Sequence, residues 1–316
     1  MNIMTEYLLK SPKVLKELIQ HSQFETIANQ VKPFSRVLLI GTGSSHIMSK
    51  AALPYMRKAL ETEVHAFRAS DEIGAKASDL LIYISQTGTS INVLENLQAH
   101  PNQQKIAITE NPDAIIAKSA AFTIDLLVGT EPCNAKTVGV SATFLSLVLL
   151  SYALSKRSHK AAIEKLENEI DQLELIINNY LNLGQETNLS EPQHLFVLTA
   201  PSLNAVGEEA SLKYIEVALR PAVYCNIDEF SHGYNRMINK DSLILYLPDQ
   251  KSDYEEPLLQ LVEEAKAKIL IAQSTSSILH SLAFVHGIIA MVADQLEIDP
   301  NYPIYDWFNR SVKTRL

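Results

Sequence analysis

The chain has 316 residues, of which 47% are hydrophobic and 20% are charged, so it is long enough for one large domain or two ordinary ones with a sizeable core. Its formal net charge of −9 argues against nucleic acid as a partner, because the phosphates would be repelled. Cys133 and Cys225 are the only cysteines and neither lies in a Cys/His cluster, which excludes a disulfide framework, indicates a reducing compartment and implies no metal.

The first 35 residues form an amphipathic segment of mixed charge, which we expect to be helical. The segment has no apolar core followed by a small-residue cleavage site, so it does not resemble a secretory signal. The longest apolar stretch with a helical pattern, residues 141–154, is shorter than the roughly 20 residues that cross a bilayer. We therefore expect a cytoplasmic protein with no membrane partner.

From Arg36 onward, short apolar runs alternate with helical segments. Unbroken apolar strands separated by helices are typical of a parallel sheet that is covered on both faces. The sequence predicts a helix over 45–59 and amphipathic helical character up to 97 after the third strand. The expected strands are 36–41, 63–69, 79–86, 105–110 and 121–126.

A long helix with one apolar stripe interrupts this alternation at 158–183. Glu and Lys occupy its other face, so we expect the stripe to pack on a core. A cluster of Gly, Asn, Ser and Pro at 184–193 predicts the end of the helix. The stripe consists of Ile163, Leu166, Ile170, Leu173, Ile177 and Leu181.

The alternation of strands and helices then restarts, which predicts a second α/β half. We expect strands over 194–200, 221–227, 242–248 and 267–273, with helices over 204–219 and 278–298. The predicted fold class is therefore α/β, with parallel sheets of about five strands flanked by helices. The predicted parts are an N-terminal helical segment (1–35), a first domain (36–157), a linker helix (158–192) and a second domain with the C-terminal tail (193–316).

Two strand-to-helix turns in the first half share an unusual chemistry. Gly41-Thr42-Gly43-Ser44-Ser45-His46 follows the first strand, and Ser85-Gln86-Thr87-Gly88-Thr89-Ser90 follows the third. Ligands of open parallel sheets bind at the carboxyl ends of strands, and a helix N-terminus attracts anions. Hydroxyl groups and close-approach glycines therefore predict a site for a small phosphate.

These turns have three other interpretations. A Ser/Thr-rich turn can be an ordinary helix N-cap, and for either turn alone this interpretation stays open. A dinucleotide loop would need the third glycine of Gly-x-Gly-x-x-Gly and an acidic residue closing the second strand, and both are missing. A Walker loop is excluded, because no Gly-Lys-Ser/Thr follows.

The order strand-GTGSS-helix, strand-SQTGTS-helix resembles the sugar isomerase (SIS) family. It is most similar to tandem-SIS enzymes: the isomerase half of glutamine–fructose-6-phosphate aminotransferase, fructosamine-6-phosphate deglycases and amino-sugar phosphate isomerase/deaminases. The resemblance extends from about Arg36 to the C-terminus and implies two SIS domains, each a flavodoxin-like three-layer sandwich. It also implies that a hexose 6-phosphate is bound by Gly43, Ser44, Ser45, Ser85, Gln86, Thr87 and Ser90.

The second half contains candidates for the chemistry. Glu209, Lys213 and Glu216 lie at i, i+4 and i+7 of one predicted helix, and His232 precedes Gly233 in a later turn. The family pairs a Glu-x-x-x-Lys-x-x-Glu helix with a His-Gly turn. The resemblance implies that Glu216 is the base that moves the proton. It also implies that His232 opens the ring from a neighbouring subunit, hence a homodimer or larger oligomer.

The same residues also have ordinary structural interpretations. A helical Glu is usually solvated, a loop His is usually structural, and Glu209 and Lys213 are expected to form an ion pair that steadies the helix. Catalysis would require Glu216 to be partly desolvated, so that its pKa rises toward the working pH.

Departures from the family pattern narrow the expected activity. Tyr234 replaces the usual proline after His-Gly, and Arg310 stands where the aminotransferase branch has an active-site lysine, unless Lys313 takes that place. Lys136 and Thr137 fall where relatives show Ser-Thr-Lys. Residues 1–35 are too short for a glutaminase domain.

These features favour a deglycase or deaminase that works without a cofactor. The alternative is a non-catalytic regulator that binds a sugar phosphate.

Overall fold

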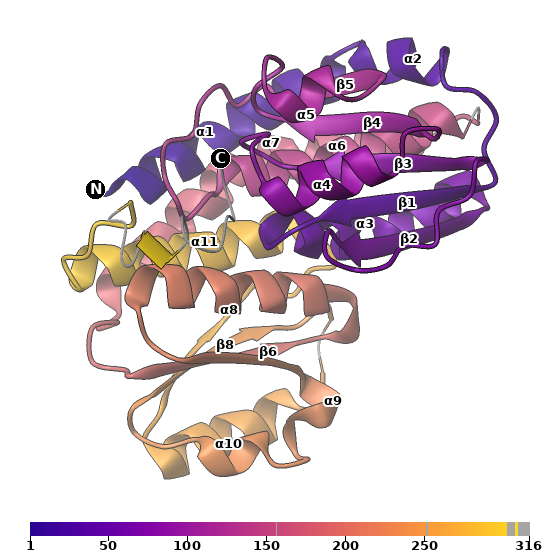
Figure 1. Cartoon of the computed structure of the whole chain (residues 1–316). Helices are drawn as coiled ribbons and strands as arrows, with labels where there is room; N and C mark the ends of the chain where they lie inside the picture. The colour runs from indigo at the N-terminus through magenta and orange to yellow at the C-terminus, as the bar shows by residue number, and fades with distance from the viewer. Residues whose placement is uncertain (156, 251, 302–306, 309–316) are drawn as a thin grey trace. The chain divides into compact units, whose positions relative to one another are not determined.

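The computed structural model describes residues 1–155, 157–250, 252–301 and 307–308, and Figure 1 shows the course of the chain. The chain divides into two compact units. Of the described residues, the five-stranded unit comprises 13–132, 138–167 and 307–308, and the four-stranded unit comprises 1–12, 133–137 and 168–301. Both sheets are parallel throughout their paired strands, as predicted. The predicted domain boundaries stay a prediction.

The sheet of the five-stranded unit has the strand order β2-β1-β3-β4-β5. On one face, a buried cluster joins alternate strand residues such as Leu38 and Leu81 to the helices α4 and α5, and Figure 1 shows α4 in front of the strands. Helix α3 packs on β1 and β2, and α6 packs on α3, so helices cover both faces. The bounds are β1 Arg36–Gly41, β2 Glu63–Arg68, β3 Asp79–Ile84, β4 Gln104–Thr109, β5 Phe122–Asp125, α2 Gln23–Ala28, α3 Ser44–Leu60, α4 Ile91–Ala99, α5 Ile115–Lys118 and α6 Val138–Leu154.

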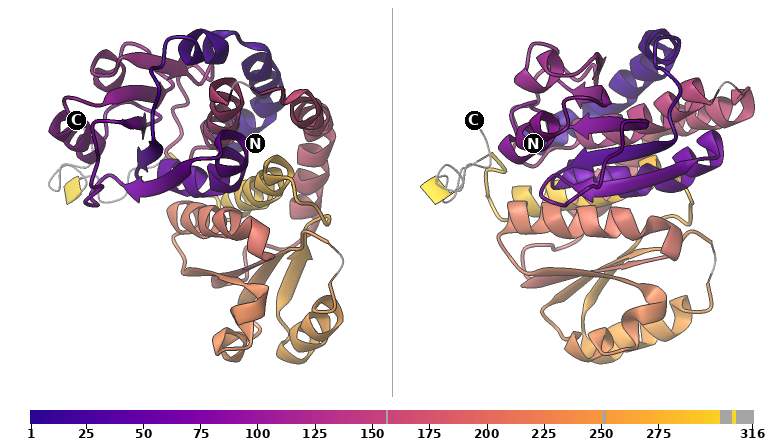
Figure 2. Two further views of the ribbon diagram at one scale, coloured as in Figure 1. Left: turned by 90° about the vertical axis from the view of Figure 1, so that its right-hand side faces the viewer. Right: turned by 45° about the vertical axis from the view of Figure 1, so that its right-hand side comes forward.

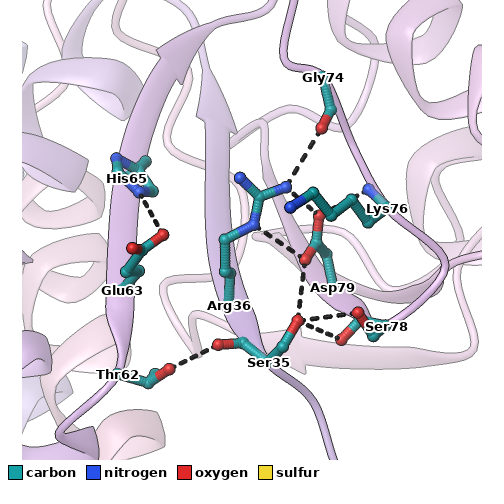
Figure 3. Close-up of polar contacts among 9 residues, drawn as sticks. All are labelled: Ser35, Arg36, Thr62, Glu63, His65, Gly74, Lys76, Ser78 and Asp79. Carbon is teal, nitrogen blue, oxygen red and sulfur yellow. Dashed lines mark hydrogen bonds and ion pairs between the residues drawn. The ribbon is translucent and has the colours of Figure 1, made fainter.

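An ion pair links the amino ends of two neighbouring strands of this sheet, as Figure 3 shows. Arg36 Nε lies 3.0 Å from Asp79 Oδ1 and Arg36 Nη2 lies 2.6 Å from Oδ2, which is a bidentate pair between the first residues of β1 and β3. The Lys76 backbone N–H donates to Asp79 Oδ2 at 2.7 Å, and the Ser35 hydroxyl donates to Oδ1 at 3.3 Å. Asp79 is fully buried, so these donors compensate its desolvation.

The sheet of the four-stranded unit has the strand order β7-β6-β8-β9. One face packs on α9 and α10 through a cluster that includes Phe196, Ile244 and Leu258. Helix α8 packs on β6, on β7 and on α11. Figure 2 shows the strands between α8 and the helices α9 and α10. The bounds are β6 His194–Thr199, β7 Ala222–Asn226, β8 Ser242–Leu247, β9 Lys268–Ile271, α8 Asn204–Ala218, α9 Ile227–Phe230, α10 Glu255–Ala265 and α11 Ile278–Gln295, with 3₁₀ turns η1 Pro201–Leu203 and η2 Tyr234–Met237.

Two helices contribute residues to both units. They are α1 (Ile3–Gln20), whose presence confirms the helical character expected for the N-terminal segment, and α7 (Lys160–Glu186). Helix α7 ends within the predicted breaker cluster, three residues beyond the predicted last residue of the helix, 183. Gly184 lies inside the helix, where an added Cβ would be 2.7 Å from Met291 Cγ on α11. This glycine therefore permits close helix packing instead of ending the helix.

The longest apolar helix differs from the one expected. Helix α11 is 18 residues long, with a mean hydropathy of 1.4, and by length and composition alone it could cross a membrane. In the structure 78% of it is buried, which is typical of the core helix of a globular domain. The helix itself was predicted, over 278–298, but residues 141–154 were taken as the longest apolar helical stretch. Helix α10 was not predicted either.

Candidate functional site

The first predicted loop forms a tight turn into a helix. Gly43 has a φ of +55° and is the N-cap of α3, whose first two residues are Ser44 and Ser45. A Cβ at Gly41 would lie 3.0 Å from both His46 N and Ser45 Cβ, so the backbone folds closely on itself at the strand end. This geometry places two serine side chains in the first turn of a 17-residue helix, where backbone N–H groups and the helix dipole favour an anion.

The second predicted loop holds its hydroxyl groups in pairs. Ser85 Oγ donates to Ser90 Oγ at 3.1 Å, and the Thr87 and Thr89 hydroxyls lie 3.0 Å apart. The Gly88 N–H donates to the Ser85 carbonyl at 2.9 Å, which closes the turn. Ser90 is the N-cap of α4, and its side chain makes no capping hydrogen bond. An ordinary N-cap role therefore does not account for the Ser90 hydroxyl.

The sheet topology brings the two loops together. Strands β1 and β3 are neighbours, with Ile40 opposite Tyr83, so both loops leave the same carboxyl edge from adjacent strands. Strand β3 ends at Ile84, two residues earlier than the predicted strand end, so Ser85 and Gln86 belong to the turn alone. One edge of one sheet therefore carries six of the residues for which phosphate binding was predicted: Gly43, Ser44, Ser45, Ser85, Thr87 and Ser90.

Gln86 makes contacts that the sequence did not predict. Its side-chain Nε2 donates to Glu110 Oε2 at 2.8 Å and to Glu131 Oε2 at 2.9 Å. Glu131 is 1% exposed, and its Oε2 also accepts the Gly139 backbone N–H at 3.1 Å, at the start of α6. Glu131 precedes Lys136 and Thr137 by a few residues, but nothing in the sequence pairs it with Gln86.

In the four-stranded unit, α8 carries a buried chain of charges. Lys213 Nζ lies 3.4 Å from Glu209 Oε1 and 2.7 Å from Glu216 Oε2, which confirms the predicted Glu209–Lys213 ion pair. Glu209 and Lys213 are buried, and the Glu216 side chain is 37% exposed. Burial acts to lower the pKa of Lys213, but the two carboxylates outweigh it and raise that pKa, so Lys213 remains a cation. A second unpredicted residue, the fully buried His286 of α11, has its Nε2 3.7 Å from Glu209 Oε1.

His232 lies in the turn after α9. Its side chain is exposed, and its backbone N–H donates to the Glu229 carbonyl at 3.0 Å. Gly233 follows with a φ of +123°, which favours glycine, and Tyr234, at the position where the resemblance led us to expect proline, begins η2. Glu216 and His232 belong to the four-stranded unit, whereas the two loops belong to the five-stranded unit.

The remaining predicted residues are distributed as follows. Thr137 is fully buried and Lys136 is partly buried, and both belong to the four-stranded unit. Arg310 and its alternative Lys313 lie outside the described residues. Within the described ranges, no group of three or more His, Cys, Asp and Glu side chains could hold a metal ion. The prediction that the protein needs no metal stays a prediction.

Residues 32–153, which include both loops, match the family model of the SIS domain. The match covers less than half of the chain and corresponds to a single copy of that domain model. The second sheet lies outside the match, so the expected tandem pair of SIS domains is not shown.

Three relatives indicate what the chain is similar to. It is 23% identical over 278 residues to the glutamine–fructose-6-phosphate aminotransferase [isomerizing] of Sulfurisphaera tokodaii, covering 84% of this chain and 46% of that protein. It is 34% identical over 141 residues to the arabinose 5-phosphate isomerase KdsD of Francisella tularensis, covering 42% and 43%. The crystal structure of a glucosamine-6-phosphate deaminase from Thermotoga maritima has a TM-score of 0.81 at 20% identity, covering 96% and 98%, which shows the fold.

The chain thus spans less than half the length of these two curated relatives.

Proposed function

We propose that this protein is an enzyme that binds a hexose 6-phosphate, or an amino or fructosamine derivative of one, and transfers a proton between C1 and C2. The pair of hydroxyl-rich loops on neighbouring strands, inside the SIS segment, is the observation that carries the proposal. Hydroxyls and N–H groups at the starts of α3 and α4 would bind the phosphate without a fixed positive charge, so that the product can leave. The relatives support the substrate class, because each is named for a sugar-phosphate reaction.

The proposed chemistry uses two groups of the four-stranded unit. His232 would assist ring opening by moving a proton between the ring oxygen and the C1 hydroxyl of an aldose. Glu216 would then take the C2 proton, leaving an enediol or an enolamine, and return it to C1. Lys213 would hold the Glu216 carboxylate in place through its 2.7 Å hydrogen bond. Arg310 would stabilise the developing oxyanion by its charge and, unlike a lysine, could not form a Schiff base.

We further propose that the four-stranded unit is a second SIS domain and that two chains assemble, with His232 entering the active site of the neighbouring subunit. The exposed position of His232 supports this role, because a histidine buried in its own chain could not reach a partner. The enzyme would work in the cytoplasm without a cofactor.

The proposal is tested with a panel of fructose, glucosamine and galactosamine 6-phosphates and a fructosamine 6-phosphate, with sugar phosphate and released amine both measured. Glu216→Gln should lower kcat on the active substrate by about 10²- to 10⁴-fold, as expected for the loss of a general base, with binding retained. Glu263→Gln, an exposed change in the same unit, is the matched control and should have no effect.

Binding of a panel compound without any turnover would favour the sugar-phosphate regulator. If no compound binds, both interpretations fail.

A further inference from the structure

Gln86 is held at the loop edge through both its main chain and its side chain. The Gln86 backbone carbonyl accepts hydrogen bonds from the Thr109 hydroxyl at 2.9 Å and from the Glu110 N–H at 2.8 Å. An added Cβ at Gly139 would lie 1.9 Å from Gln86 Nε2 and 2.3 Å from Oε1. The carboxamide therefore lies flat against the first turn of α6, at a position that only glycine leaves open.

The two carboxylates fix which way this carboxamide points. An ionised carboxylate only accepts hydrogen bonds, so the side of Gln86 that faces Glu110 and Glu131 must be the NH₂ group. Its two N–H donors match the two carboxylate oxygens at 2.8 and 2.9 Å, so this orientation uses both. The reversed amide would place its oxygen against two carboxylate oxygens and leave both N–H donors without these partners.

The other end of the carboxamide is open. No donor from the described part of the chain reaches Gln86 Oε1, and this oxygen is not among the buried side-chain atoms that lack a partner there. Oε1 is therefore not completely buried, and it can only accept a hydrogen bond. A phosphate dianion offers no donor, so the Gln86 side chain is poorly suited to bind the phosphate, unlike the role the sequence implied for it.

We propose that the Gln86 side chain binds the sugar part of the substrate and not its phosphate: Oε1 accepts a hydrogen bond from a hydroxyl or ammonium group of the substrate. Glu131 is the positioning residue, which holds the Gln86 NH₂ group and so keeps Oε1 directed toward the substrate. This inference rests on the proposed function, since the loop hydroxyls must hold the phosphate beside it. A substrate with a donor next to its phosphorylated end, such as a polyhydroxylated or amino sugar phosphate, fits this arrangement. An apolar phosphate ester would lack the matching donor.

Isothermal titration calorimetry with three probes tests the assignment: fructose 6-phosphate, glucosamine 6-phosphate and inorganic phosphate. Gln86→Met keeps the length of the side chain but removes its oxygen. It should weaken at least one of the two sugar phosphates about tenfold, the value of one hydrogen bond, and change inorganic phosphate affinity less than twofold. Gln30→Met, an exposed change in the same unit, is the matched control and should alter none of the three affinities.

A second pair of variants separates positioning from general damage. Glu131→Ala removes the acceptor and should reproduce the selective loss seen in Gln86→Met. Glu131→Gln retains an oxygen that can accept from Gln86 and from Gly139, and it should restore sugar-phosphate affinity to within about threefold of the wild type. A role limited to stability would move the unfolding temperature in Glu131→Ala without changing the ratio of sugar-phosphate to phosphate affinity.

The outcomes distinguish this inference from the proposed function. A wild-type protein that binds neither a sugar phosphate nor inorganic phosphate contradicts the proposed function. Two other results would leave a phosphate site but overturn the assignment of Gln86 to the sugar. One is a wild-type protein that binds inorganic phosphate as tightly as it binds both sugar phosphates. The other is a Gln86→Met variant whose affinity for all three probes falls equally.

Discussion

The polar groups at the two edges of the five-stranded sheet are of different kinds. At the amino edge, Arg36 and Asp79 form a bidentate ion pair that further donors complete. At the carboxyl edge, the loops carry paired hydroxyls, such as Ser85 with Ser90, that bind mainly one another. Both edges gather polar groups where strands end, but an ion pair joins the strands at the amino edge, whereas the hydroxyl pairs of the loop at the carboxyl edge are uncharged.

The difference shows which edge is built for stability and which for binding. A charge-assisted bidentate pair is strong and specific, so a ligand could displace it only at a large cost in free energy. Hydroxyl groups are both donors and acceptors, so a pair of them can open and turn toward an oxyanion at small cost. Substitutions at the two edges should therefore separate stability from ligand binding.

The largest expected effect on stability comes from Arg36→Met. This change leaves the buried Asp79 carboxylate without its charge partner, which typically destabilises a protein by about 3–5 kcal/mol. We expect the lower end of that range, because Arg36 is 21% exposed. Urea unfolding measures the loss, and binding of inorganic phosphate to the folded variant should be unchanged. Weakened phosphate binding without a loss of stability would contradict the division between the two edges.

The same interaction predicts a pH dependence. Burial acts to raise the pKa of Asp79, but hydrogen bonds from Arg36 and Lys76 outweigh it and hold that pKa below its ordinary value of 3.8. A carboxyl with a lowered folded-state pKa contributes stability above its unfolded pKa and loses it as pH falls through the folded value. The difference in unfolding free energy between wild type and Arg36→Met should therefore be largest near neutral pH and narrow below about pH 4. A constant difference from pH 7 to pH 3 would show that the ion pair is not its source.

At the carboxyl edge, Gly88→Ala should cost less stability but abolish phosphate binding. Gly88 has a φ of +72°, and its Cβ would lie 2.3 Å from Ala114 Cβ, so the loop must shift away from α5. The strained backbone and the overpacking together should destabilise the protein by about 2–3 kcal/mol. Titration with inorganic phosphate and urea unfolding of the same variant provide the check. Wild-type phosphate affinity in a stably folded variant would mean that this loop does not hold the anion.

The sequence predicted most of the fold, because buried parallel strands leave a local signal. The five strands from Arg36 to Asp125 were located to within a few residues, and the two loops follow from their ends. Contacts between distant residues left no such signal. Glu131 lies 45 residues from Gln86, and Gly139 owes its role to a side chain that packs on it from another loop. Likewise Gly184 was taken for a helix end, because only the packing of α11 explains it.

The smallest effect on stability and on phosphate binding is expected for a substitution at Gly43, the glycine of the first loop. This substitution forms a matched pair with Gly88→Ala. Gly43 also has a positive φ, of +55°, but a Cβ there would meet no atom within 4 Å. Gly43→Ala should therefore cost only the backbone strain of a conformation that residues other than glycine rarely adopt (φ +55°, ψ −133°), about 1–3 kcal/mol, and leave the loop in place. Phosphate affinity should fall less than in Gly88→Ala, because the serine side chains of α3 keep their positions. If Gly43→Ala instead abolishes phosphate binding while unfolding at nearly the wild-type urea concentration, the added methyl group must occupy space that the anion needs, and the first loop would approach the phosphate more closely than the second.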